Sequence, residues 1–266
     1  MDTSDTNDTH PPLTLKTMKR FLILTQSLTL AYMREPMVVF WNLVFPLFLL
    51  VIYRFVFGET DVGGDNFIQW VVPGVVVLNV LSFGILGSSS FMLQMRTTGV
   101  LRRLQATPTP TAVLFGAFMA VNVLMCLAQT AVVIIFAAAV FGWTASLQGL
   151  LLSAPMILLA VVVAVALGQC ISSLSPRFGI ALAVGQLIYF VQMFIAGLVI
   201  PIEMMPGWLQ EVARLLPAYA IGDLVRSPLL DGGLSAEAMR NAGLSAIYGL
   251  TAGLIAIRFF RWESRA

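Results

Sequence analysis

Charged residues are scarce in this chain of 266 residues: Asp, Glu, Lys and Arg make up 11%, whereas hydrophobic residues make up 59%. Soluble domains usually carry about 25% charged residues. This shortage excludes an ordinary soluble domain and indicates an integral membrane protein. The net charge of +2 says little by itself, and the chain has no basic–aromatic pattern of the kind that binds nucleic acid.

Chemically reactive side chains are also few. His10 is the only histidine, and it lies in a polar N-terminal stretch. Cys126 and Cys170 lie inside apolar segments, where we expect small core residues and neither a disulfide nor a metal site. The phosphate-binding loop of ATPases requires Gly-Lys-Ser/Thr, and neither of the two lysines, Lys16 and Lys19, follows a glycine. The chain therefore lacks that loop.

Intramembrane proteolysis is disfavoured for the same reason. Gly87-Ser88-Ser89 lies in an apolar segment, but a nucleophilic serine needs a base, and no histidine lies near it. Small residues more often allow helices to approach closely. None of the thirteen acids is expected at mid-membrane, which argues against an aspartyl protease and weakens an ion-coupled carrier. We expect no enzymatic activity and no metal or cofactor bound by this chain.

The chain divides into three parts. Residues 1–12 predict a disordered cytoplasmic tail, and residues 13–36 predict an interfacial helix with Lys16, Lys19 and Arg20 on one face. Residues 37–265 predict a single all-α transmembrane domain with six spans of about 20 apolar residues each. The spans are Met37 to Phe57, Phe67 to Leu93, Ala112 to Phe141, Leu147 to Leu174, Phe178 to Ile200 and Ala242 to Phe260.

The distribution of Lys and Arg predicts the orientation. With the N-terminus in the cytoplasm, eleven of the 15 basic residues lie inside: Lys16, Lys19, Arg20, Arg34, Arg96, Arg102, Arg103, Arg177, Arg258, Arg261 and Arg265. The remaining four, Arg54, Arg214, Arg226 and Arg240, lie outside. Because basic residues favour the cytoplasmic side, we expect both termini to be cytoplasmic.

A basic island from Gln94 to Pro108 separates the second and third spans. It predicts a short helix, with Thr98 as its N-cap and Pro108 as its end. Its arginines are Arg96, Arg102 and Arg103, and its apolar face consists of Val100, Leu101 and Leu104. Two interpretations remain open: a solvated loop whose arginines fix the orientation, or a docking element for a cytoplasmic partner.

The long outer connection from Pro201 to Arg240 is amphipathic. A short helix between Pro206 and Pro217 exposes Trp208 on its apolar face, which is typical of a re-entrant or interfacial element. Asp223 and Arg226, three residues apart, predict a structural ion pair.

The polar groups within the spans are uncharged amides. They either hold helices together, at about 1 kcal/mol each, or line a path for an amphipathic solute. The candidates for a path are Asn79, Asn122, Gln129, Gln186 and Gln192.

Three stretches, in this order and with six spans, resemble the membrane subunit of the type-2 ABC exporter family, over about residues 15 to 265. The first is Arg34-Glu35-Pro36 with Phe40-Trp41 and Phe45-Pro46-Leu47. The second is Pro73-Gly74 with Arg96 to Gly99, Leu101-Arg102-Arg103-Leu104 and Thr107-Pro108. The third is Gly197, Pro201, Glu203, Pro206, Trp208-Leu209, Leu216-Pro217 and Arg226.

The resemblance implies a role for each region. The island, with Arg96, Thr97, Gly99, Val100, Leu101, Arg102, Arg103 and Leu104, is similar to the coupling helix that sits in a groove of the ATPase subunit. Residues 13–36 are similar to the connecting helix, and Pro201, Glu203, Pro206, Trp208 and Pro217 belong to a re-entrant exit loop. Thr97 departs from the family, which often has an acid there.

The resemblance also implies an assembly and a function. Two permease chains pair with two ATPase chains, which bind ATP and Mg, in a bacterial inner membrane. The cargo is expected to be a hydrophobic or amphipathic solute, since no charged side chain is expected within the spans. The alternatives are an ion-coupled carrier or channel that works alone and a membrane scaffold without a transport role.

Overall fold

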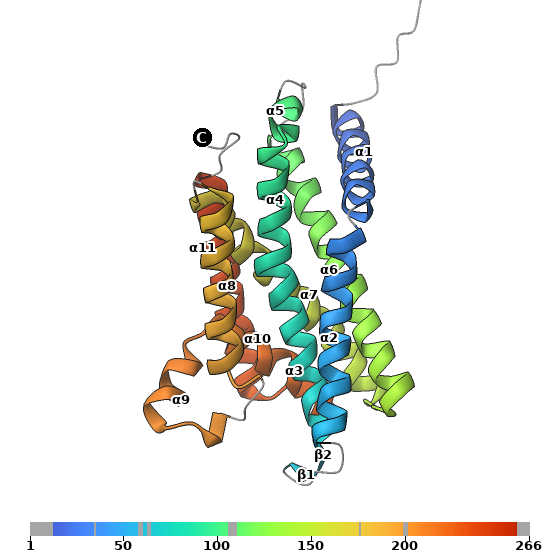
Figure 1. Ribbon diagram of the computed structural model, residues 1–266, viewed down its shortest axis with the longest axis vertical. Helices are drawn as coiled ribbons and strands as arrows, with labels where there is room; N and C mark the ends of the chain where they lie inside the picture. Colours follow the sequence, from blue (N-terminus) through green and yellow to red (C-terminus); the bar gives the residue numbers. More distant parts are fainter. Residues whose placement is uncertain are drawn as a thin grey trace, which may run out of the picture.

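The computed structural model describes residues 13–34, 36–57, 61–62, 65–105, 111–175, 177–198 and 202–259, which form an elongated bundle of helices (Figure 1). The predicted tail, residues 1–12, lies outside this described part. The helices are α1 (Leu13–Met33), α2 (Pro36–Phe57), α3 (Phe67–Leu81), α4 (Ser88–Thr97), α5 (Val100–Gln105), α6 (Thr111–Phe141), α7 (Leu147–Leu174), α8 (Phe178–Ile195), α9 (Gly207–Arg214), α10 (Pro217–Asp231) and α11 (Ala236–Arg258), with a short 3-10 helix, η2 (Ile202–Met204).

A single continuous helix, Phe67–Thr97, forms the centre of the bundle. It joins α3 to α4 through a π-helical segment, η1 (Ser82–Gly87). In its most apolar stretch 83% of the residues are buried, against 28%, 44% and 22% in the three other long apolar helices, α6, α7 and α8. The other helices therefore pack around this one, which runs from one end of the bundle to the other.

Small residues bring α7 into backbone contact with η1. A Cβ atom added to Gly168 would collide with the carbonyl oxygen of Gly84, and one added to Gly84 would collide with Ala164. This proximity lets Gln169 Nε2 donate a hydrogen bond to the Ser88 carbonyl, at 3.2 Å. Because lipid supplies no hydrophobic force between helices, such close packing and interhelical hydrogen bonds are what hold a membrane bundle together.

The N-terminal helix α1 packs on the bundle beside α6, near the end where α5 lies (Figure 1). Leu28 and Tyr32 are buried, and the Tyr32 ring lies 5.9 Å from the Phe83 ring and 5.5 Å from the Phe91 ring, between centroids. The sequence predicted a helix at the membrane interface here. The structure shows in addition that the C-terminal half of α1 is part of the core of the bundle.

The long apolar helices confirm an α-helical membrane protein, with four described helices long and apolar enough to span a membrane by length and composition. Three boundaries differ from the prediction by several residues. The helix α8 ends at Ile195, five residues before the predicted Ile200. The central helix continues to Thr97 and includes Arg96, whereas α11 begins at Ala236, six residues before the predicted Ala242. In both places the helix extends beyond its apolar stretch, and hydropathy detects only the apolar stretch.

The end of the bundle opposite α5 contains a short hairpin and two shorter helices (Figure 1). The hairpin, β1 (Asp61–Val62) and β2 (Asp65–Asn66), was not predicted, and its register pairs Asp61 with Asn66 and Val62 with Asp65.

Local sequence signals determine where α10 begins and ends and where α11 begins. Pro217 opens α10, Gly232 ends it with φ of 69°, and the Ser235 side chain caps α11 by accepting from the Ala238 N–H at 2.9 Å.

The contact of α7 with η1 predicts an unequal response to two glycine substitutions. Gly168→Val places a branched side chain against the Gly84 carbonyl, and overpacking of this kind costs about 1–3 kcal/mol. We expect a lower thermal unfolding temperature in detergent. Gly253→Val is the matched control, because nothing lies within 4 Å of a Cβ there. Equal unfolding temperatures for the two variants would contradict this account of the packing.

Candidate functional site

An apolar cavity of about 320 Å³ lies between α2, the α3–η1 segment and α8. Its walls are mostly aromatic and aliphatic, with a few polar side chains among them. The lining consists of Phe45, Pro46, Leu49, Leu78, Asn79, Ser82, Phe83, Leu86, Gln186, Tyr189 and Phe190. It lies within the size range of small-molecule sites, which are typically apolar with few polar groups. None of these residues is an Asp, Glu, Lys, Arg or His.

The π-helical segment shapes one wall of this cavity. A π-helix accommodates an extra residue in a helical turn and often occurs at functional sites. Ser82, Phe83 and Leu86 of this segment line the cavity together with Tyr189 of α8. Ser82 and Tyr189 were not predicted as site residues, because no local pattern marks a serine or a tyrosine as facing a cavity.

The five candidate amides separate into two groups. Asn79 and Gln186 lie together at the apolar cavity, and Asn79 Nδ2 also donates to Thr130 Oγ1 at 3.2 Å. Asn122 Nδ2 bonds to the Phe118 carbonyl of its own helix at 2.8 Å, and Gln129 is buried. The structure thus places two of the five on the cavity and the other three elsewhere.

Gln192 joins α8 to the start of α10. Its Oε1 accepts a hydrogen bond from the Ala218 backbone N–H at 3.0 Å, and both residues are buried. The first N–H groups of a helix have no partner within the helix, so Gln192 supplies an acceptor from outside the helix. This contact holds α10 against the end of α8.

A sharp corner separates α4 from α5. Gly99 has φ of 71°, in the left-handed region that glycine tolerates best. The Thr98 hydroxyl donates to the Gln94 carbonyl at 2.8 Å, as does that of Thr97 at 3.0 Å. Thr98 therefore completes the end of α4, and its predicted role as N-cap of the following helix is wrong. The island is the end of one helix plus the separate helix α5.

Two residues predicted to contact a partner are buried within this chain. Arg96 is 5% exposed and donates from Nη1 to the Ser172 carbonyl of α7 at 3.1 Å. Leu101 is 1% exposed and belongs to the core. The exposed residues of the corner are Thr97, Thr98 and Arg103, with Gly99 and Val100 partly buried. The side chains of Arg102 and Leu104 lie outside the described residues.

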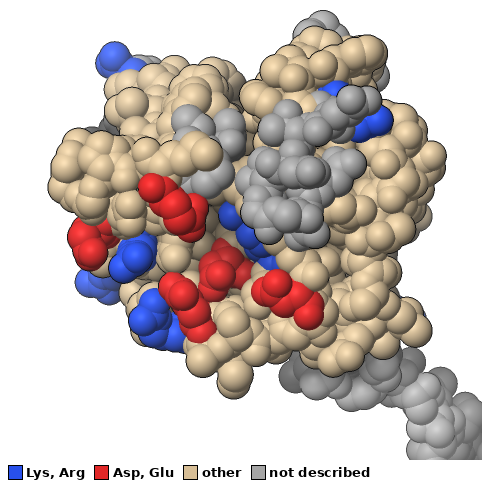
Figure 2. Space-filling model, turned by 90° about the horizontal axis from the view of Figure 1, so that it is seen from below, with Lys and Arg blue, Asp and Glu red and all other residues tan. Residues whose placement is uncertain are grey.

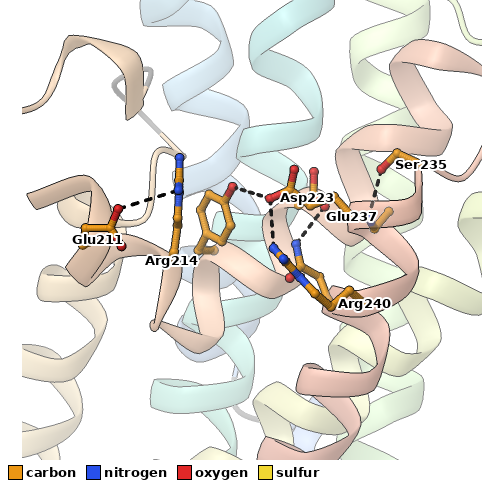
Figure 3. Close-up of polar contacts among 9 residues, drawn as sticks. Glu211, Arg214, Asp223, Ser235, Glu237 and Arg240 are labelled. Carbon is orange, nitrogen blue, oxygen red and sulfur yellow. Dashed lines mark hydrogen bonds and ion pairs between the residues drawn. The ribbon is translucent and has the colours of Figure 1, made fainter. Parts of the chain in front are cut away.

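The outer connection contains the predicted amphipathic helix as α9. Trp208 is 70% exposed and Pro206 is exposed, whereas Pro217 is partly buried at the start of α10. Glu211 and Arg214 form an exposed pair on α9 at 3.8 Å, apart from the Glu237–Arg240 pair within α11 (Figure 3). Glu203 is exposed in η2, and Pro201 lies outside the described residues.

A bundle of long apolar helices with an aromatic-lined cavity is the architecture of a helical membrane protein. The sequence profile of the ABC-2 type transporter family matches residues 19–230, and the chain belongs to this family. It is also similar to ABC transporter G family member 20 of Dictyostelium discoideum, at 27% identity over 170 residues. The match covers 63% of this chain and 23% of that relative, so the chain spans about a quarter of the relative's length.

Family membership defines the general role. The chain is a membrane domain of the ABC-2 transporter family, that is, a permease domain of an ABC transporter. The resemblance drawn from the scattered motifs is therefore confirmed.

The contact between Gln192 and α10 yields a prediction on stability. Gln192→Leu removes the acceptor and leaves the buried Ala218 N–H without a partner, at a cost of about 1–3 kcal/mol. We expect a lower unfolding temperature and faster proteolysis between α8 and α10. Gln148→Leu, at an exposed position near the start of α7, serves as the control. An unchanged proteolysis rate for Gln192→Leu would show that this bond does not hold α10.

Proposed function

We propose that the chain is the permease subunit of an ATP-driven exporter that moves a hydrophobic or amphipathic solute out across a bacterial inner membrane. It pairs with a second permease chain, either a copy of itself or a related chain, and with two separate ATPase subunits, which bind ATP and Mg. The single domain of residues 37–265 crosses the membrane six times, through α2, Phe67–Thr97, α6, α7, α8 and α11. The end of the bundle that contains α5 faces the cytoplasm, together with both termini.

The apolar cavity is the observation that carries this proposal. An amphipathic solute matches a cavity with aromatic walls and a few polar side chains, among them Asn79, Ser82 and Gln186. A site for coupling to an ion gradient would usually contain ionisable or broken-helix elements at mid-depth. Since the cavity lining has no acid, base or histidine, this observation favours a solute over an ion.

The corner between α4 and α5 supports the coupling role. Arg96 fastens the end of α4 to α7, and Leu101 fastens α5 to the core. A displacement of α5 by an ATPase is therefore transferred to the central helix through buried contacts, and the exposed residues are free to touch the partner. We assign the direct contact to Thr97, Thr98 and Arg103, and a supporting role to Arg96 and Leu101.

The outer elements support a role at the exit. α9 and α10 lie at the end of the bundle opposite α5 (Figure 1), and Gln192 binds the start of α10 to α8. We propose that α9 and α10 are a re-entrant pair that closes the path on the outer side.

Docking through Arg103 is tested by charge reversal. Arg103 is exposed on α5, so Arg103→Glu leaves the core intact while opposing an acidic groove on the partner. We expect stimulation of the ATPase in reconstituted membranes to fall about tenfold, the effect of about 1.4 kcal/mol. Arg258→Glu, exposed at the end of α11 on the same side, is the control. An equal loss of stimulation in both variants, or no loss in either, would contradict the assignment of a direct ATPase contact to Arg103.

The apolar cavity is tested by filling it. Gln186→Phe places a ring in the cavity, and Leu187→Phe places the same ring on the exposed face of α8, where Leu187 is 65% exposed. We expect Gln186→Phe to reduce export into inverted vesicles by about tenfold or more while assembly with the ATPase is retained. Leu187→Phe should export at the unmodified rate. Normal export by Gln186→Phe would exclude this cavity from the path.

A further inference from the structure

A second cavity of about 320 Å³ lies at the end of the bundle opposite α5, and we call it the charged cavity. It lies between the ends of α3 and α8 and the helices η2, α10 and α11. Figure 2 shows this end of the molecule, where acidic side chains surround a hollow that also contains basic side chains. The lining includes Trp70, Glu203, Tyr219, Asp223, Arg226 and Glu237.

Arg226 places a guanidinium in this cavity, and none of the described contacts is an ion pair with it. Its guanidinium carbon lies 4.6 Å from the centre of the Trp70 ring, and Nη1 donates to the Gly197 carbonyl over a long 3.4 Å. Its Nε and Nη2 atoms are buried and have no hydrogen-bond partner within the described part of the chain. Burial lowers the pKa of this guanidinium. A buried charge is costly unless it is paired, so one edge of Arg226 can still accept an anionic partner.

The carboxylates of the cavity form no ion pair with Arg226 among the described contacts. Asp223 accepts from Asn241 Nδ2 at 2.9 Å, and the predicted ion pair between Asp223 and Arg226 is not formed among the described contacts. Glu237 accepts from the Tyr219 hydroxyl at 3.2 Å and from Arg240 Nη2 at 3.4 Å (Figure 3). These bonds commit two acids to the joint between α10 and α11.

Negative charge is in excess around the cavity. Glu203 is exposed and makes no hydrogen bond or ion pair among the described contacts. Three carboxylates line the cavity against one guanidinium, and they remain in excess when Arg240, which contacts Glu237 from outside, is counted as well. The cavity therefore favours a positive group, while Arg226 favours a negative one.

We propose that the charged cavity binds the zwitterionic head of an amphiphile, with its acidic group at Arg226 and its ammonium among Glu203, Asp223 and Glu237. Arginine donors bind carboxylate and phosphate strongly, and an ammonium group is attracted both by carboxylates and by the aromatic faces of Trp70 and Tyr219. A head of net zero charge satisfies both requirements, whereas a singly charged head satisfies only one.

The position of the charged cavity relative to the apolar one fits an elongated amphiphile. Trp70 of the charged cavity and Asn79 of the apolar cavity lie on the same helix, nine residues apart. At 1.5 Å per residue this separation is about 13 Å. Tyr189 of α8 lines the apolar cavity and Gly197, two residues after the end of α8, lines the charged one, so the two cavities also follow one another along this second helix. An amphiphile of that length reaches both cavities, with its apolar part at Asn79 and its head at Arg226.

This inference rests on the proposed export function in one respect only, namely that the bound amphiphile is the transported cargo. The test is therefore a binding measurement on the full-length chain in an uncharged detergent, without ATPase or ATP. Loss of binding would leave export to be judged by the vesicle assay, and loss of export would leave the binding result intact.

Four probes of matched chain length separate the charges of the head. Lysophosphatidylethanolamine and an Nε-acyl-lysine are zwitterions that differ in their acidic group, phosphate or carboxylate. Lysophosphatidylglycerol carries only the negative charge, and an alkylamine only the positive one. Each displaces a fluorescent lysophosphatidylethanolamine. We expect at least one zwitterion to bind about tenfold tighter than both singly charged probes, and the better zwitterion identifies the acidic group.

Two substitutions assign the two halves of the head. Arg226→Gln should weaken the zwitterion and the anionic probe about tenfold and leave the alkylamine unweakened. Glu203→Gln should weaken the zwitterion and the alkylamine only. The matched control is Glu211→Gln, an exposed glutamate of α9 that lies outside the cavity lining.

The proposal is overturned if the unmodified chain binds all four probes equally, or if Glu211→Gln has the same effect as Glu203→Gln. Because Arg226 is buried, Arg226→Gln is first checked for folding by thermal unfolding. If it does not fold, Glu203→Gln at its exposed position still decides, and unchanged zwitterion binding by that variant would also overturn the proposal.

Discussion

The approach of α7 to the π-helical segment is the contact on which the other features depend. Since lipid does not drive helices together, backbones must come close enough for dispersion and hydrogen bonds to act. Gly84 and Gly168 permit this approach, and Gln169 then reaches the Ser88 carbonyl. Further along the same pair of helices, Arg96 reaches Ser172. The close contact of α7 with the central helix therefore positions α5 and the η1 wall of the apolar cavity.

The long helices could be predicted because hydropathy responds to composition, and a helix in lipid needs about 20 apolar residues. Boundaries failed where a helix continues through polar residues. Arg96 was predicted to belong to a basic island outside the second span because it is charged, yet it is part of the central helix and satisfies a carbonyl of a neighbouring helix. Residues 236–241 read as a loop before the last span, but Asn241 binds Asp223. In each case the partner comes from another helix, which a local pattern does not reveal.

The site could be predicted only in part, because the rotation of each helix about its axis decides whether an amide on it faces the cavity. Gln186 and Gln192 lie on the same helix with the same chemistry, but one faces the apolar cavity and the other binds the start of α10. On the central helix the lining residues Leu78, Asn79, Ser82, Phe83 and Leu86 recur at ordinary helical spacing. Spacing groups these residues on one face, but it does not reveal which neighbouring helix that face meets.

The central helix gives the two ends of the bundle a common element. It begins at Phe67 beside the charged cavity, passes the apolar cavity at Asn79 and Ser82, and ends at Thr97 beside α5. A regular α-helix transmits a displacement along its axis with little change in length, because each turn is held by its own hydrogen bonds. The π-helical turn interrupts that regularity, and it does so at the apolar cavity. A movement of α5, as proposed for coupling, would pass through Arg96 to the central helix and would meet the wall of that cavity before the contact of Trp70 with Arg226.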